Sequence, residues 1–209
     1  MMSATSNPSS SRPAALAGWG WTLIVVLASG TSLASARYIF GGAIMIPPPL
    51  KPNFLGHTLF FYIHIGAASV ALLFGPWQFL TPLRRRYRDL HRAMGTIYVA
   101  ACLVGGLAAL PIAVGSNGGP VAAAGFLTLA VLWLYTTGRA VAAIAAMDIP
   151  AHRRWMVRSF ALTLAGVTLR LYLPVALAGP FAFSAAYAVI AWLCWAPNLL
   201  AAERFVVRR

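Results

Sequence analysis

The sequence predicts an all-α fold: a polytopic integral membrane protein, a bundle of about six transmembrane helices with both termini in the cytoplasm. Of its 209 residues, 60% are apolar and 9% are charged, which leaves too little polar surface to cover a water-soluble globule. The apolar residues also form runs of about 20 residues, the length that crosses a bilayer core of roughly 30 Å. Arginine, in turn, gathers in alternate loops between these runs.

The spans are expected at residues 19–40, 55–80, 91–114, 121–147, 151–178 and 181–200. The first continues for about 20 residues without a small-residue cleavage site, so we expect a retained span rather than a signal peptide. The breaks between spans contain residues that end or start helices. They are Gly41 with the prolines at 47–49 in a short extended loop, Thr81 with Pro82, the turn at 115–120, Asp148 with Pro150, and Gly179 with Pro180.

The domain organisation follows from these spans. Residues 1–17, rich in Ser, Ala and Pro, are expected to form a disordered N-terminal tail. Residues 18–203 form the transmembrane domain, and residues 204–209 form a basic C-terminal tail.

The distribution of cations predicts the orientation in the membrane, because cytoplasmic loops carry an excess of Lys and Arg. One side of the predicted bundle has thirteen arginines, whereas the other has Arg37 and Lys51. The thirteen are Arg12, Arg84, Arg85, Arg86, Arg88, Arg92, Arg139, Arg153, Arg154, Arg158, Arg204, Arg208 and Arg209. We therefore expect a multi-pass protein of the bacterial inner membrane with the arginine-rich side in the cytoplasm.

The net charge of +13 does not predict nucleic-acid binding, because the cations lie at the ends of apolar runs, where topology requires them. The two cysteines, Cys102 and Cys194, lie inside apolar runs, so the sequence implies no disulfide framework.

Five segments resemble a bacterial family of membrane proteins designated domain of unknown function 2306. They are GPWQF at 75–79, HRAMGTIY at 91–98, HRRWMVRS at 152–159, TLRLY at 168–172 and WLCWAPN at 192–198. The resemblance covers about residues 55 to 203 and implies membership of the family, which brings no settled activity with it.

Two histidines open the third and fifth spans, His91 and His152, each followed by Arg and each with a methionine one turn on, Met94 and Met156. If these helices face each other, the two imidazoles could bind the iron of a b-type haem, with a nearby cation such as Arg158 holding a propionate. Copper bound by His and Met is one alternative. The other is a structural role at the membrane interface.

On the opposite side, His64 and Arg170 are predicted at similar depth, on the order of 10 Å below the surface. A cation in hydrocarbon needs a partner, yet the acids Asp89, Asp148 and Glu203 all belong to the arginine-rich side. The partner could be a backbone carbonyl, water, or a ligand such as a lipid phosphate, a quinone or a haem propionate. Alternatively, Arg170 reaches the headgroups through its long stem.

A second haem is not expected, because the remaining histidines, His57 and His64, are predicted seven residues apart on one helix. A solute transporter is disfavoured by the absence of buried acids and of a predicted pair of broken helices. The sequence identifies no catalytic residue.

Our leading hypothesis is a membrane redox component with one haem b on His91 and His152, and with His64 and Arg170 lining a pocket for a quinone. The alternative is an accessory or structural subunit that binds lipid, a larger membrane complex or a second copy of itself, without chemistry of its own.

Overall fold

The computed structural model describes residues 14–207, and this part of the chain is built from helices without strands. Six of its helical segments are long and apolar enough to cross a membrane, which confirms the predicted fold class. The helices are α1 (Ala14–Gly41), α2 (Lys51–Gly56), α3 (Thr58–Phe74), α4 (Thr81–Arg86), α5 (Arg88–Val114), α6 (Gly119–Ala145), α7 (Ile149–Thr163), α8 (Ala165–Ala178), α9 (Phe183–Leu193) and α10 (Ala196–Val207). Short 3₁₀ turns occur at Gly42–Ile44, Pro48–Leu50 and Pro76–Phe79.

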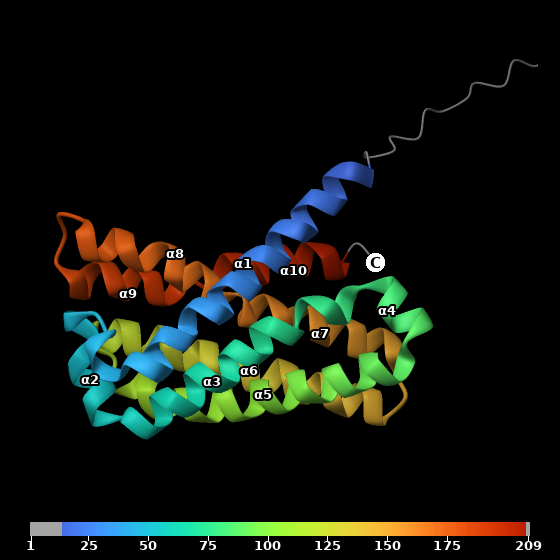
Figure 1. Cartoon of the computed structure of the whole chain (residues 1–209), viewed down its shortest axis with the longest axis horizontal. Coiled ribbons are helices and arrows are strands. Elements are labelled where there is room, and N and C mark those ends of the chain that lie inside the picture. Colours follow the sequence, from blue (N-terminus) through green and yellow to red (C-terminus); the bar gives the residue numbers. More distant parts are fainter. Residues whose placement is uncertain (1–13, 208–209) are drawn as a thin grey trace, which may run out of the picture.

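The bundle has two chemically different ends. We call the end with α4, the start of α5 and the start of α7 the arginine-rich end, which lies on the right in Figure 1. The opposite end contains α2 and the turn between α5 and α6. Which of the two faces the cytoplasm stays a prediction.

Consecutive helices α3, α5, α6 and α7 pack side by side along the long axis of the molecule, and α1 crosses over them (Figure 1). The α8 and α9 helices form a hairpin beside α1. Alanine and glycine at the helix contacts let the backbones approach closely, as in other membrane bundles; Ala71, Ala101, Ala140 and Gly105 are buried there. The helix α1 is tied to α3 by a hydrogen bond in which Ser32 Oγ donates to the Ser69 carbonyl at 2.8 Å.

Two predicted details near the second span were wrong. The proline-rich loop is not extended, since Pro48–Leu50 forms a 3₁₀ turn that leads into α2. The fixed φ of proline suits the first turn of a helix, where no N–H is needed. His57 also does not share a helix with His64, because it is the non-helical residue between α2 and α3, with φ −135° and ψ 33°.

The fifth and sixth spans each consist of two helices, where the sequence predicted one. The chain bends at Leu164 between α7 and α8, and at Cys194 between α9 and α10. Pro197, which lacks an N–H, follows the second bend. Both bend residues keep right-handed helical angles, so the backbone is not unwound at either bend.

The predicted tails fall mostly outside the described residues. Residues 1–13 of the expected N-terminal tail lie outside them, and α1 begins at Ala14. At the other end, α10 continues through Val207, and residues 208–209 lie outside.

Candidate functional site

A buried network of hydroxyl groups joins α5, α6 and α7 in the middle of the bundle. The Tyr98 hydroxyl lies 2.9 Å from Ser159 Oγ and 2.9 Å from Thr163 Oγ1. Thr137 Oγ1 lies 2.8 Å from Ser159 Oγ, and the indole N–H of Trp133 donates to Thr163 Oγ1 at 2.9 Å. All five side chains are buried. The network therefore satisfies polar groups that would be costly in hydrocarbon without partners.

The donor and acceptor in each of these hydrogen bonds can be assigned by starting from Thr163. Thr163 donates its proton to the Ser159 carbonyl at 2.9 Å, so it accepts from Tyr98. Tyr98 then accepts from Ser159, and Ser159 accepts from Thr137. The series of hydrogen bonds ends at a backbone carbonyl, which has no proton to pass on. We therefore interpret the network as a structural link between helices and not as a proton-transfer path.

Tyr98 also gives the register between α5 and α7, which run in the same direction from the arginine-rich end. Residues seven positions apart share a helix face, two turns and about 10 Å apart. Moving seven residues from Tyr98 and from Ser159 toward the arginine-rich end gives His91 and His152. An electrostatic interaction between the two histidines agrees with this register.

The hydrogen bonds of these histidines leave ring nitrogens free. His152 Nδ1 donates to the Ala140 carbonyl at 2.8 Å, which fixes its tautomer and leaves the Nε2 lone pair available. His91 Nδ1 is buried and has no protein partner. Neither imidazole is fully exposed or fully buried.

Gln78, to which the sequence assigned no role, lies against α5 one turn from His91. Its side chain is 7% exposed, and Nε2 is buried without a hydrogen-bond partner. A Cβ at Gly95 would stand 3.0 Å from Gln78 Oε1, so the glycine makes room for the amide. Gly95 is one turn from His91 on the same face of α5. Two buried nitrogens, Gln78 Nε2 and His91 Nδ1, therefore lack a protein partner in this region.

Several cations converge near the histidine pair. His91 is within electrostatic range of Arg84 and Arg92. Burial, and then repulsion by Arg153 and Arg85, lowers the pKa of the Arg84 guanidinium. The local field at this end is therefore positive and suits negative groups.

Arg158, predicted as a cofactor contact, is already paired. Its Nε and Nη2 donate to Glu203 Oε1 at 2.6 Å and Oε2 at 2.8 Å, which ties α7 to α10. The guanidinium also lies 4.7 Å from the ring centre of Trp155. A propionate contact from Arg158 stays a prediction and would compete with Glu203.

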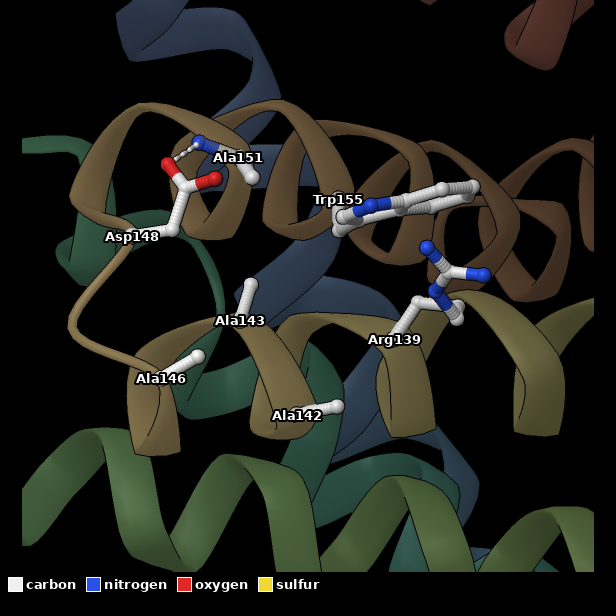
Figure 2. Close-up of a pocket in the computed structure, with 7 residues that line it drawn as sticks. All are labelled: Arg139, Ala142, Ala143, Ala146, Asp148, Ala151 and Trp155. Atoms are coloured by element: carbon white, nitrogen blue, oxygen red, sulfur yellow. Dashed lines mark hydrogen bonds between the residues drawn. The ribbon is translucent and has the colours of Figure 1, made fainter.

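A shallow pocket of about 270 Å³ opens between α6 and α7 at the same end. Figure 2 shows Arg139 stacked near Trp155 on one side and Asp148 on the other, above a floor of alanines. Asp148 caps α7 by accepting a hydrogen bond from the Ala151 N–H at 2.9 Å. One side of the pocket is therefore aromatic and cationic, and the carboxylate on the other side, Asp148, already accepts a hydrogen bond from the backbone.

His64 and Arg170, the predicted residues of the opposite half, lie within electrostatic range of each other. His64 Nδ1 donates to the Gly105 carbonyl of α5 at 2.9 Å, and its ring packs edge-on against Trp133 with 6.5 Å between centres. Arg170 Nη1 donates to the Gly166 carbonyl of its own helix at 2.9 Å. A quinone bound here stays a prediction.

Among residues 14–207, no group of three or more His, Cys, Asp or Glu side chains could hold a metal ion. An iron site with two protein ligands, such as a haem, is a different arrangement that this observation does not test. Copper binding by Met94 and Met156 likewise stays a prediction, although Met156 is buried in the core.

Sequence reasoning missed the hydroxyl network and Gln78. A signal existed for the network, since Ser159 and Thr163 are polar residues four apart in an apolar run, which share a helix face. Nothing in the sequence indicates that Tyr98 and Thr137 meet them.

Comparison with known proteins identifies the family. A family model described as a predicted membrane protein, DUF2306, matches residues 61–206. No curated protein and no solved structure matches the chain. The matched region runs from the start of α3 to α10 and includes the histidine pair, the hydroxyl network and Arg170. The chain therefore belongs to the DUF2306 family of membrane proteins.

Proposed function

We propose that this protein is a redox component of the bacterial inner membrane that binds one haem b near the cytoplasmic face, with His91 and His152 as axial ligands. The observation that carries the proposal is the hydrogen bonding of Tyr98 to α7, because His91 and His152 each lie two turns from that link toward the arginine-rich end and interact electrostatically. A bound haem would supply reversible one-electron transfer.

The donor set supports this group. The His152 Nδ1–H bond to the Ala140 carbonyl leaves Nε2 as the free donor atom, an arrangement typical of histidines that bind metals. Arg84, Arg92 and Arg153 supply positive charge for propionates. Gln78 Nε2 and His91 Nδ1 have no protein partner, so they can donate to oxygen atoms of a ligand.

Absorption spectroscopy tests the proposal. The protein, expressed with a supply of haem and purified in detergent, is expected to show a haem absorption band that changes on reduction with dithionite. His91→Ala and His152→Ala are each expected to remove about nine tenths of the haem, since one imidazole seldom holds b-type haem as firmly as two.

His57→Ala is the matched control, because His57 bonds to Asn53 at the opposite end and is expected to leave haem content unchanged. A protein without a haem band despite the supply would contradict the proposal, and so would full haem retention in both single variants. Either result would favour the accessory or structural subunit.

A further inference from the structure

The pocket between α6 and α7 has two opposite charges that do not contact each other. Arg139 lies at one end of the pocket and Asp148 at the other, with alanines of both helices between them (Figure 2). Asp148 and Trp155 are two turns of α7 apart, or about 10 Å, and the Arg139 guanidinium carbon lies 5.2 Å from the centre of the Trp155 ring. Among the described residues, no ion pair involves Arg139 or Asp148. Both charges are therefore available to a ligand.

Arg139 is exposed, and most of its hydrogen-bond donors are free. A guanidinium has five N–H groups, and the hydrogen bond of Arg139 runs from Nη1 to the Tyr135 hydroxyl at a long 3.5 Å. The Tyr135 and Trp155 ring centres lie 5.9 Å and 5.2 Å from the guanidinium carbon, within the range of cation–π contacts. A planar guanidinium placed in this way can still donate in a bidentate manner to the oxygens of a phosphate group.

The carboxylate of Asp148 is suited to a primary ammonium group. Its Oδ1 accepts a hydrogen bond from the Ala151 N–H, whereas Oδ2 has no hydrogen-bond partner in the described part of the chain. A primary ammonium has three N–H donors for such an oxygen. A trimethylated ammonium has none and prefers aromatic faces, but the Trp155 ring already has Arg139 and Arg158 within cation–π range.

The order of these groups along the membrane normal matches one class of lipid. Arg139 lies about 9 Å before the end of α6 at Ala145, and Asp148 follows in the turn beyond that end. One and two turns deeper on the same face of α6, Tyr135 and Val131 are half exposed. From the membrane interior outward, the surface is thus apolar, then cationic, then anionic. In phosphatidylethanolamine the acyl chains, the phosphate and the primary ammonium follow in the same order.

We propose that this pocket binds the headgroup of phosphatidylethanolamine, with Arg139 donating to the phosphate and Asp148 accepting from the ammonium. The pocket volume of about 270 Å³ is below the range of about 300 to 1,000 Å³ typical of sites for drug-sized ligands, so it suits a small headgroup. His91 and His152 do not line the pocket, and the lipid site stands independently of the proposed haem.

Native mass spectrometry of the delipidated protein in detergent, with synthetic phospholipids added one at a time, tests the site. The wild type is expected to bind one phosphatidylethanolamine about tenfold more tightly than phosphatidylglycerol, which lacks the ammonium, or phosphatidylcholine, whose ammonium lacks N–H groups. Arg139→Gln is expected to weaken the binding of phosphatidylethanolamine about tenfold, the effect of losing one charge-assisted contact. Asp148→Asn is expected to abolish the preference over phosphatidylglycerol, while asparagine still caps α7.

Arg154→Gln is the matched control, because Arg154 is exposed at the same end and does not line the pocket. This variant is expected to bind phosphatidylethanolamine as the wild type does. Arg139 and Asp148 are exposed as well, so their variants are expected to fold, which melting temperatures without lipid check.

Three results would overturn the proposal. The first is equal affinity of the wild type for the three phospholipids, and the second is unchanged binding of phosphatidylethanolamine by Arg139→Gln. The third concerns the source of the ligand. Water-soluble phosphoethanolamine is expected not to displace the lipid at equal concentration, because it lacks the acyl chains that contact the apolar face of α6. Its displacement of the lipid would assign the pocket to a soluble ligand instead.

Discussion

Tyr98 connects α5 to the buried hydroxyl network. Its hydroxyl accepts from Ser159 and donates to Thr163, so one oxygen links α5 to two successive turns of α7. Burial of the aromatic ring in hydrocarbon is favourable, whereas the buried hydroxyl needs hydrogen-bond partners. The same residue sets the register that brings His91 level with His152.

Removing that hydroxyl has a predictable cost. Tyr98→Phe leaves the Ser159 proton without an acceptor and Thr163 without one of its donors, so we expect a loss of about 1 to 3 kcal/mol in stability. Thermal melting in detergent measures it. Tyr135→Phe is the matched control, because Tyr135 is half exposed and its hydroxyl takes only a long 3.5 Å contact from Arg139. Equal melting temperatures for Tyr98→Phe and the wild type would contradict a structural role for the network.

At the scale of helices, the two bends in the fifth and sixth spans lie against each other. Thr168 Oγ1 donates to the Cys194 carbonyl, and Asn198 Nδ2 donates to the same carbonyl at 3.1 Å and to Thr168 Oγ1 at 3.2 Å. A carbonyl at a helix bend would otherwise lack a partner in the membrane. In transporters with broken helices, free backbone carbonyls at the break bind the transported ion. Here the side chains of Thr168 and Asn198 already occupy the Cys194 carbonyl.

Thr168→Val is expected to lower stability by about 0.6 to 2 kcal/mol, since it removes the cross-link between helices while keeping the side-chain shape. Thr96→Val is the control, because Thr96 is exposed and bonds only to the carbonyl of Arg92 in its own helix. Melting temperatures of the two variants against the wild type give the comparison. If both variants shift equally, the link between α8 and α10 contributes nothing beyond a local helix bond.

For the whole molecule, charge asymmetry is the dominant feature. Asp89 and Asp148 lie at the arginine-rich end, and Glu203 pairs with Arg158 farther along α7. Among the described residues, no ion pair involves Arg37 or Arg170. The two ends therefore differ in charge as well as in their expected side of the membrane.

The orientation can be tested with reporter cysteines. Cys102 and Cys194 are fully buried, so they are expected not to react with a membrane-impermeant maleimide. Ser116→Cys, in the turn before α6, is expected to label in intact cells, whereas Arg86→Cys is expected to label only after permeabilisation. The reverse pattern would place the arginine-rich end outside and would contradict the expected topology.

Span positions were predictable because bilayer thickness and helix rise together set the length of the apolar run that each span needs. The turn at 115–120 and the start of the fifth span at Pro150 are examples, where glycine and proline act on their own neighbours. The bend at Leu164 was not predictable, since both sides of it are apolar. The break at His57 was missed although Gly56 directly precedes it, because a single glycine next to an apolar run does not by itself end a helix.

For the candidate site, the sequence identified His91 and His152 by their matching positions at two helix starts, and Arg170 by its depth. It assigned no role to Gln78, which lies in a 3₁₀ turn within the GPWQF segment and packs against α5 at Gly95.

The sequence by itself determined that the chain is a six-span membrane protein, because hydrophobic length and the placement of arginine are local properties. Only the tertiary structure decided which polar groups meet. The contact of Tyr98 with Ser159, and that of His64 with the Gly105 carbonyl, depend on the rotation and register of helices far apart in the sequence. The rotation and register of the helices are set by side-chain packing between them, and the hydropathy of the sequence contains no information about that packing.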